Sequence, residues 1–118
     1  MNFLGKKGET IVAKYLLKKG YKILEKNYRL PFGEIDIIAK DKNEIVFVEV
    51  KSASQKIFSP QEKLSSQKIK KILKVAQAYL LKFYPNFPWR IDLICLIQKD
   101  KKVFSLIHFK RAVKGNLK

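Results

Sequence analysis

Three of the few acidic residues stand inside apolar segments, where carboxylates are least expected. The chain has 118 residues with only 10 Asp and Glu, yet Glu34, Asp36 and Glu49 fall in segments rich in Ile and Val. If these segments form a hairpin that turns on residues 42–43, Asp36 lies opposite Glu49, and Glu34 lies opposite Lys51. Directly opposed residues share a face of the sheet, so all four side chains would project together.

The chemistry that such a face could support is metal binding. Two facing carboxylates repel each other, and a bridging divalent cation keeps them together; oxygen ligands of this kind suit Mg²⁺ or Mn²⁺. Lys51 would stand beside the cation, where it could orient a water molecule or stabilise charge on a phosphate. The competing interpretation is that Glu49 and Lys51, or Glu34 and Lys51, form ordinary cross-strand ion pairs.

A fourth carboxylate, Glu9, lies in a segment with the apolar spacing of a helix. At about 100° per residue, Val12, Ala13 and Leu16 fall on the same side as Glu9, at the edge of the buried face. A cation shared with the hairpin carboxylates would offset the cost of burying this charge. The alternative is a favourable interaction of Glu9 with the positive N-terminus of its own helix.

The elements that must position these residues follow the order α-β-β-β-α-β-β. Apolar periodicity predicts helices over residues 4–19 and 59–84, and strands over residues 21–30, 34–40, 44–51, 90–98 and 103–109. Gly20 is a suitable end for the first helix, and the run Ser59-Pro60-Gln61-Glu62 predicts the start of the second. Residues 52–58 are expected to form a polar loop. The order predicts an α/β fold with a mixed sheet of about five strands and helices packed on it.

The composition restricts the class of protein. The length fits one domain over residues 1–118, Cys95 is a single cysteine, and no apolar run is long enough to span a membrane. The first residues lack the pattern of a secretory signal, so we expect a reduced, cytoplasmic protein without a membrane segment. Lys and Arg number 26 against 10 acids, a net charge of +16, and this excess favours nucleic acid as the partner.

Three motifs in order resemble the YraN-type family of small, poorly characterised bacterial proteins. They are Gly8-Glu9 followed by Ala13, the run from Gly33 to Ala39, and the run from Val46 to Lys51. That family is similar to the PD-(D/E)xK nuclease superfamily, whose fold is shared by Holliday-junction resolvases and tRNA endonuclease domains. The resemblance implies a restriction-endonuclease-like three-layer fold, with a central mixed sheet flanked by helices.

The resemblance also implies roles for individual residues. Asp36, Glu49 and the backbone carbonyl of Val50 would hold Mg²⁺, Lys51 would be the catalytic lysine, and Glu9 would support the site. In such a site a water molecule attacks the phosphorus in line while the cation and the lysine stabilise the added charge. The chain departs from the family at Ala53, where an Arg is usual.

Three basic residues are candidates for contacting nucleic acid. Lys68 lies near the apolar side of its helix and either reaches a phosphate or covers core residues with its aliphatic stem. Lys71 belongs to an exposed lysine face that could follow a phosphate backbone. Arg90 is a further candidate, although its alternation with Asp92 favours a structural ion pair. His108 is expected to be an edge-strand residue rather than a general base.

Three functions remain open at this point. The first is a Mg²⁺- or Mn²⁺-dependent endonuclease that hydrolyses phosphodiester bonds, with DNA favoured over RNA. The second is a nucleic-acid-binding module that keeps the fold without cleaving, and the third is a basic assembly protein whose acids only balance lysines. Because many nucleases of this fold act as dimers, a homodimer is one expectation for the assembly.

Overall fold

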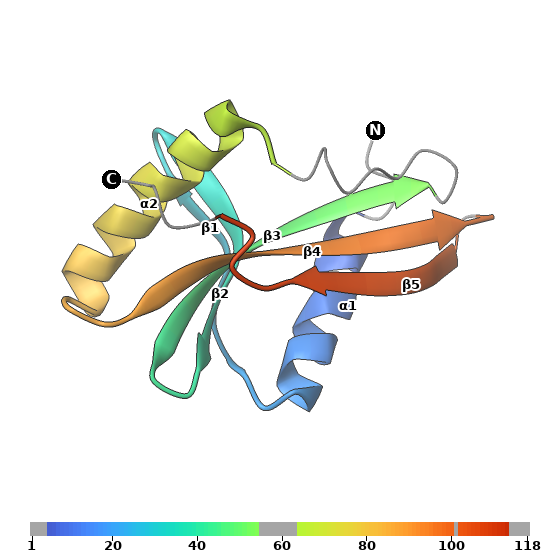
Figure 1. Cartoon of the computed structure of the whole chain (residues 1–118), viewed down its shortest axis with the longest axis horizontal. Helices are drawn as coiled ribbons and strands as arrows, with labels where there is room; N and C mark the ends of the chain where they lie inside the picture. Colours follow the sequence, from blue (N-terminus) through green and yellow to red (C-terminus); the bar gives the residue numbers. More distant parts are fainter. Residues whose placement is uncertain (1–4, 55–63, 101, 114–118) are drawn as a thin grey trace.

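The computed structural model describes residues 5–54, 64–100 and 102–113 (Figure 1). Two helices and five strands follow one another in the predicted order α-β-β-β-α-β-β, which is therefore confirmed. Their bounds are α1 Gly5–Lys18, β1 Lys22–Leu30, β2 Gly33–Asp41, β3 Glu44–Ser54, α2 Ser66–Phe83, β4 Trp89–Lys99 and β5 Lys102–Phe109.

The five strands form one mixed sheet in the order β1-β2-β3-β4-β5. Neighbouring strands run antiparallel except β3 and β4, which are parallel and joined through α2. A parallel pair requires such a crossover connection, and a helix usually supplies it. The α/β architecture with a mixed five-stranded sheet and flanking helices is thus confirmed.

The hairpin between β2 and β3 has the register on which the sequence argument depends. Asp41 pairs with Glu44 across a two-residue turn, in which Lys42 has a φ of 57°. The ladder continues to Ile37 opposite Val48, one step before Asp36 and Glu49. The predicted register is therefore confirmed up to the carboxylates.

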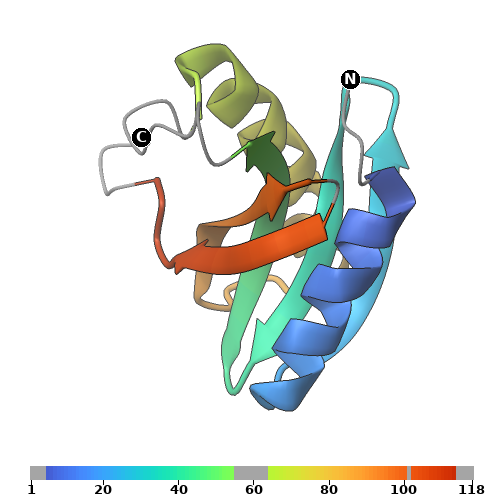
Figure 2. The ribbon, with the colours of Figure 1, turned by 90° about the vertical axis from the view of Figure 1, so that its right-hand side faces the viewer.

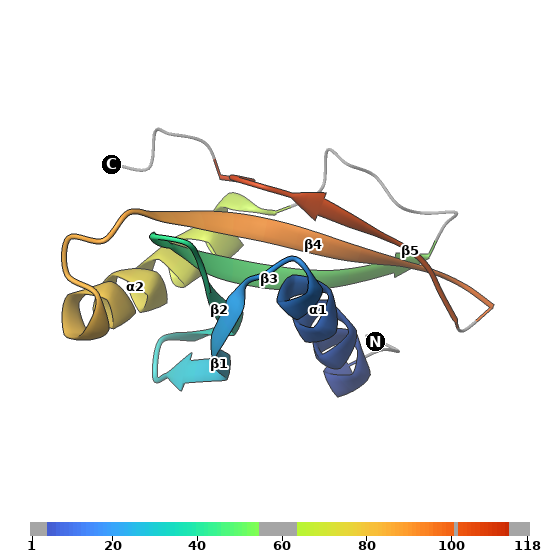
Figure 3. The same ribbon diagram turned by 90° about the horizontal axis from the view of Figure 1, so that it is seen from below.

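The two helices cover opposite faces of the sheet (Figures 2 and 3). Val12 and Leu16 of α1 pack in one buried cluster with Val48, whereas Val75 of α2 packs in another with Phe47. Adjacent residues of β3 thus point to different helices, as the two-residue period of a strand requires. Full burial of such side chains contributes about 1.5–3 kcal/mol each, so both helices are held firmly on the sheet.

The end of α1 is set by a local backbone motif. Gly20 has a φ of 92°, the N–H of Gly20 donates to Leu17, and the N–H of Tyr21 donates to Leu16. This is a Schellman arrangement, which glycine favours because a side chain is strained at positive φ. The predicted end of the first helix is confirmed, and Tyr21 is placed directly under the sheet.

Two of the predicted boundaries concern the start of α2 and the end of β3. The predicted helix start at residues 59–62 lies outside the described residues; α2 begins at Ser66, and Ser65 caps it by accepting the N–H of Lys68. β3 extends to Ser54, beyond the predicted loop start at Ser52, because it pairs with β4 along its whole length.

A close approach of α2 to β2 fixes the position of the helix over the carboxylates. A Cβ added at Gly33 would lie 3.1 Å from Val75 Cγ2 and 3.5 Å from the carbonyl oxygen of Lys71. Only a residue without a side chain fits this contact without a shift. In the described part of the chain, neither helix is long and apolar enough to cross a membrane.

Candidate functional site

Asp36 and Glu49 meet where β2 and β3 leave their regular ladder. Asp36 Oδ2 accepts the backbone N–H of Val50 at 2.8 Å, so a carboxylate replaces the strand contact expected at this level. The Asp36 and Glu49 side chains also share a hydrogen bond. The pair that the sequence predicted to face one another is therefore brought together.

The environment of this pair disfavours two negative charges. Burial raises the pKa of Glu49 to about 7, and the charge of Asp36 contributes to that rise. Burial likewise raises the pKa of Asp36, against the opposing effects of the Val50 N–H and of the Glu49 hydrogen bond. Near neutral pH the two carboxyl groups consequently retain a proton that isolated surface carboxylates would lose.

Lys68 supplies a positive charge from the first turns of α2. Its Nζ lies 3.1 Å from Glu49 Oε2, and 44% of its side chain is exposed against 13% for Glu49. Burial opposes the charge of Lys68, but the carboxylates of Glu49 and Asp36 outweigh it and raise the pKa of the lysine. The interpretation of Lys68 as a residue that reaches the site is supported, because its ammonium group contacts a site carboxylate.

The other residues predicted for the site are placed differently. Lys51 is half-buried on β3 opposite Cys95, two positions from Glu49. Glu9 is half-buried on α1, which packs on the face opposite α2. Among the described residues, no three His, Cys, Asp or Glu side chains come close enough to hold a metal ion together. The expected convergence of Glu9 with the two hairpin carboxylates is therefore not found.

Arg90 is buried in a network of hydrogen bonds rather than presented to a ligand. Its side chain is 6% exposed and donates to Asp92 Oδ1 at 3.0 Å, Glu44 Oε1 at 2.7 Å and Tyr21 Oη at 2.7 Å. Asp41 Oδ2 accepts two longer bonds of 3.3 Å. The predicted ion pair with Asp92 is confirmed, whereas the assignment of Arg90 as a contact for nucleic acid is corrected, since its donors are already used.

His108 lies on the edge strand β5, as predicted, and also belongs to the same network. His108 Nε2 lies 2.7 Å from Asp92 Oδ2, and His108 Nδ1 lies 2.9 Å from Tyr15 Oη. Sequence reasoning missed this group because it joins α1, β4 and β5. The signal that could have revealed it is Asp92 itself, a carboxylate in a mainly apolar strand, which requires partners when it is buried.

Comparison with known proteins identifies the family. The pattern of the uncharacterised protein family UPF0102 matches residues 8–96, which include Glu9, Asp36, Glu49 and Arg90. The chain belongs to this family. The resemblance to the YraN-type proteins is thereby confirmed.

The UPF0102 relatives match along most of their length. The protein from Thermodesulfovibrio yellowstonii is 50% identical over 101 residues, covering 85% of this chain and 88% of the relative. The protein from Clostridioides difficile is 52% identical over 103 residues, which cover 86% of this chain and 90% of that relative. The protein from Campylobacter fetus is 44% identical over 105 residues, which cover 89% of this chain and 93% of that relative.

One solved structure resembles this UPF0102 chain distantly. It is SfsA from Pyrococcus furiosus in complex with Ca²⁺, with a TM-score of 0.42 and 20% identity, covering 90% of this chain and 62% of that chain. A likeness at this level carries no inference about function.

Lys71 of the UPF0102 chain lies on the exposed face of α2, as predicted. Lys70 and Lys74 are exposed on the same helix, so the three lysines form a solvated basic face. This face starts one turn from Lys68 and the carboxylate pair. A polyanion lying along α2 would pass the site.

Proposed function

We propose that this protein binds nucleic acid and hydrolyses its phosphodiester bonds with the help of a divalent cation, with DNA as the substrate. The observation that carries the proposal is the buried pair Asp36 and Glu49. Two buried carboxylates at this distance repel each other when both are ionised. A divalent cation bound between them would remove this repulsion.

The donor set fits Mg²⁺ or Mn²⁺. Asp36 and Glu49 offer hard oxygen ligands, and Val50, whose carbonyl is the third predicted ligand, directly follows Glu49 in the chain. Mg²⁺ in proteins is held by one or two carboxylates, with water and substrate phosphate completing its shell, so three protein acids are not required. The absence of Glu9 from the pair is therefore compatible with such a site. A cation bound there would supply charge stabilisation at the phosphate and lower the pKa of a bound water molecule.

The chain's own residues would prepare the site and hold the substrate. The proton retained by Glu49 and Asp36 must leave before a cation is bound, so cation binding should strengthen as the pH rises above about 7. Lys68 balances Glu49 and has enough exposed surface to contact a phosphate instead. Lys51 lies two residues after Glu49 on β3, where it would stabilise charge that develops on a phosphate.

A specific observation favours a second function, binding without cleavage. Lys68 lies 3.1 Å from Glu49 and offsets its charge, and Ala53 stands where the resemblance to the YraN-type family implies an Arg. A site with its own cation from the protein has less need of a metal ion. The net charge of +16 would support binding in either case.

The deciding experiment compares cleavage and binding in matched variants. Plasmid and branched DNA are incubated with wild-type protein, Asp36→Asn, Lys51→Ala and Asp100→Asn, each with Mg²⁺, Mn²⁺ or EDTA. Asp100 is an exposed residue of the turn between β4 and β5, and its variant changes the net charge by the same amount as Asp36→Asn.

Metal-dependent cleavage by wild type and Asp100→Asn that is lost in Asp36→Asn and Lys51→Ala is the expected result. Binding without cleavage under any metal would refute hydrolysis and leave the binding module. Failure to bind or cleave DNA would refute both functions.

A further inference from the structure

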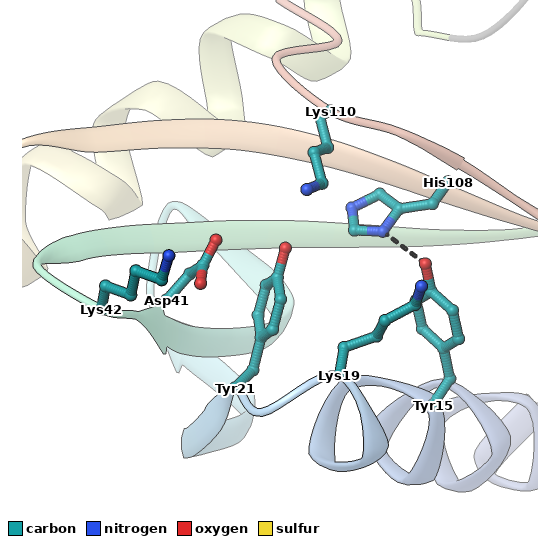
Figure 4. Close-up of a pocket in the computed structure, with 7 residues that line it drawn as sticks. All are labelled: Tyr15, Lys19, Tyr21, Asp41, Lys42, His108 and Lys110. Carbon is teal, nitrogen blue, oxygen red and sulfur yellow. Dashed lines mark hydrogen bonds between the residues drawn. The ribbon is translucent and has the colours of Figure 1, made fainter.

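A pocket of about 260 Å³ opens on the α1 side of the sheet, away from the carboxylate pair (Figure 4). It lies between the end of α1, the β2–β3 turn and β5, and its lining includes Tyr15, Tyr21 and His108. Asp41 at this pocket and Asp36 are five positions apart along β2, about 17 Å at the rise of a strand. The pocket is therefore distinct from the proposed metal site.

The wall of the pocket is a hydrogen-bonded chain. Asp92 is fully buried, and although burial opposes its charge, bonds from His108, the Arg111 N–H and Arg90 outweigh burial and lower its pKa. His108 Nε2 is hydrogen-bonded to Asp92, and His108 Nδ1 is hydrogen-bonded to Tyr15 Oη. This chain fixes the orientation of the imidazole and of the Tyr15 ring.

Tyr21 directs a donor into the pocket. Arg90 donates to Tyr21 Oη at 2.7 Å, so the hydrogen of that hydroxyl must point elsewhere, and the hydroxyl group faces the pocket (Figure 4). Burial raises the pKa of Tyr21, partly against the charge of Arg90, so the hydroxyl remains protonated at neutral pH. The pKa of Tyr15 is raised in the same direction by burial and by the charge of Asp92, which disfavours either tyrosine as a nucleophile.

Three lysines complete the rim with positive charge. Lys19, Lys42 and Lys110 line the pocket, and all three are exposed. Asp41 also lines it, but its Oδ2 accepts hydrogen bonds from Arg90. The lining therefore has a net positive charge, with hydroxyl and ammonium donors directed at one space.

We infer that this pocket binds a phosphate group. Converging ammonium groups and a fixed hydroxyl donor match the oxygens of a phosphate, whereas a cation would be repelled and an apolar ligand would find few apolar walls. The volume accommodates a phosphate with a small attached group, and the half-buried ring of Tyr15 lines the same space. The phosphate belongs either to a small phosphorylated molecule or to the end of a polynucleotide.

Calorimetric titration with inorganic phosphate at constant ionic strength tests the inference. The test variants are the double substitution Lys42→Ala/Lys110→Ala, confined to exposed rim residues, and Tyr21→Phe. The matched control is Lys26→Ala/Lys82→Ala, which removes the same charge from exposed positions outside the pocket. Circular dichroism verifies that each variant is folded.

We expect saturable binding by wild type and control, weakened about tenfold or more in the double rim variant and severalfold in Tyr21→Phe. No saturable binding up to about 10 mM phosphate would overturn the inference, since that concentration corresponds to negligible affinity. Equal weakening in rim variant and control would also overturn it, because the effect would then be one of net charge.

Two dinucleotides that differ only in a 5′-phosphate identify the source of the phosphate. If only the 5′-phosphorylated dinucleotide displaces inorganic phosphate, the pocket is assigned to a polynucleotide end. If neither dinucleotide displaces inorganic phosphate, the pocket is assigned to a small phosphorylated molecule. Both results support phosphate binding, whereas equal competition by both dinucleotides would refute recognition of the terminal phosphate.

Discussion

Replacing Glu49 with Gln is expected to stabilise the protein, and to do so increasingly as the pH rises. Burial and the neighbouring Asp36 raise the pKa of Glu49 from 4.5 to about 7. Between these two values the folded state binds more protons than the unfolded state, so stability falls as the pH rises through this window. Below the window the carboxyl group is protonated in both states and costs nothing, whereas above it the full cost of the buried charge is present.

The expected change in unfolding free energy follows from the rise in the pKa of Glu49. A pKa raised by about 2.5 units corresponds to about 3 kcal/mol of unfolding free energy lost between pH 4.5 and 8. The ion pair with Lys68 is already included in this value, because Lys68 lowers the pKa of Glu49 against the effect of burial. The expected gain at pH 8 is therefore about 3 kcal/mol, or a rise in Tm of about 12 °C for a chain of this size.

Urea unfolding followed by circular dichroism at pH 5, 6.5 and 8 measures this difference. The control is Glu44→Gln: burial opposes the charge of Glu44, but hydrogen bonds from Arg111 and Arg90 outweigh burial and lower its pKa. The control variant should therefore be destabilised by a similar amount at all three pH values, because a carboxylate with a lowered pKa stays ionised between pH 5 and 8. A second series with Mg²⁺ at pH 8 should stabilise wild type but not Glu49→Gln.

Two outcomes would refute the reasoning. A Glu49→Gln variant less stable than wild type at pH 8 would show that the Lys68 ion pair outweighs the burial cost. A gain in stability that does not change between pH 5 and 8 would show that ionisation of Glu49 is not its cause.

Three further predictions concern the fold and its charge. Arg90→Met is expected to destabilise the protein by about 3–5 kcal/mol in urea unfolding, because it leaves the buried Asp92 without its main cation. Gly20→Ala should cost about 1 kcal/mol in the same assay, since alanine is strained at a φ of 92°; an unchanged midpoint would contradict this. If the protein binds DNA through its lysines, affinity should fall about 10³-fold or more between 50 mM and 200 mM salt in fluorescence anisotropy, as for about six or more neutralised phosphates; a flat response would exclude binding through the lysines.

The β2–β3 turn and the end of α1 could be predicted because each depends on residues that are neighbours in the chain. Residues 42–43 form the predicted two-residue turn, and the register that follows brings Asp36 to Glu49. Gly20 ends α1 because its backbone adopts a conformation that other residues resist. Turns and strand alternation depend on neighbours in the chain, so the hairpin with its carboxylate pair was accessible from sequence alone.

The surroundings of that pair depended on packing between distant segments. α2 begins at Ser66, and its close contact with Gly33 is what places Lys68 on Glu49. The convergence of Glu9, by contrast, was predicted from helix periodicity and was not found. Periodicity identifies the buried side of a helix but does not specify which face of the sheet it covers.

The second site could be seen only in the tertiary structure. Tyr15, Arg90, Asp92 and His108 come from α1, β4 and β5, and of their contacts only the ion pair of Arg90 with Asp92 was predicted from the sequence. A buried carboxylate requires partners, but which residues provide them is decided by strand pairing and helix placement across the sheet. The sequence by itself therefore determined the hairpin and its acids, and only the tertiary structure decided which cations, hydroxyls and imidazole surround the buried charges.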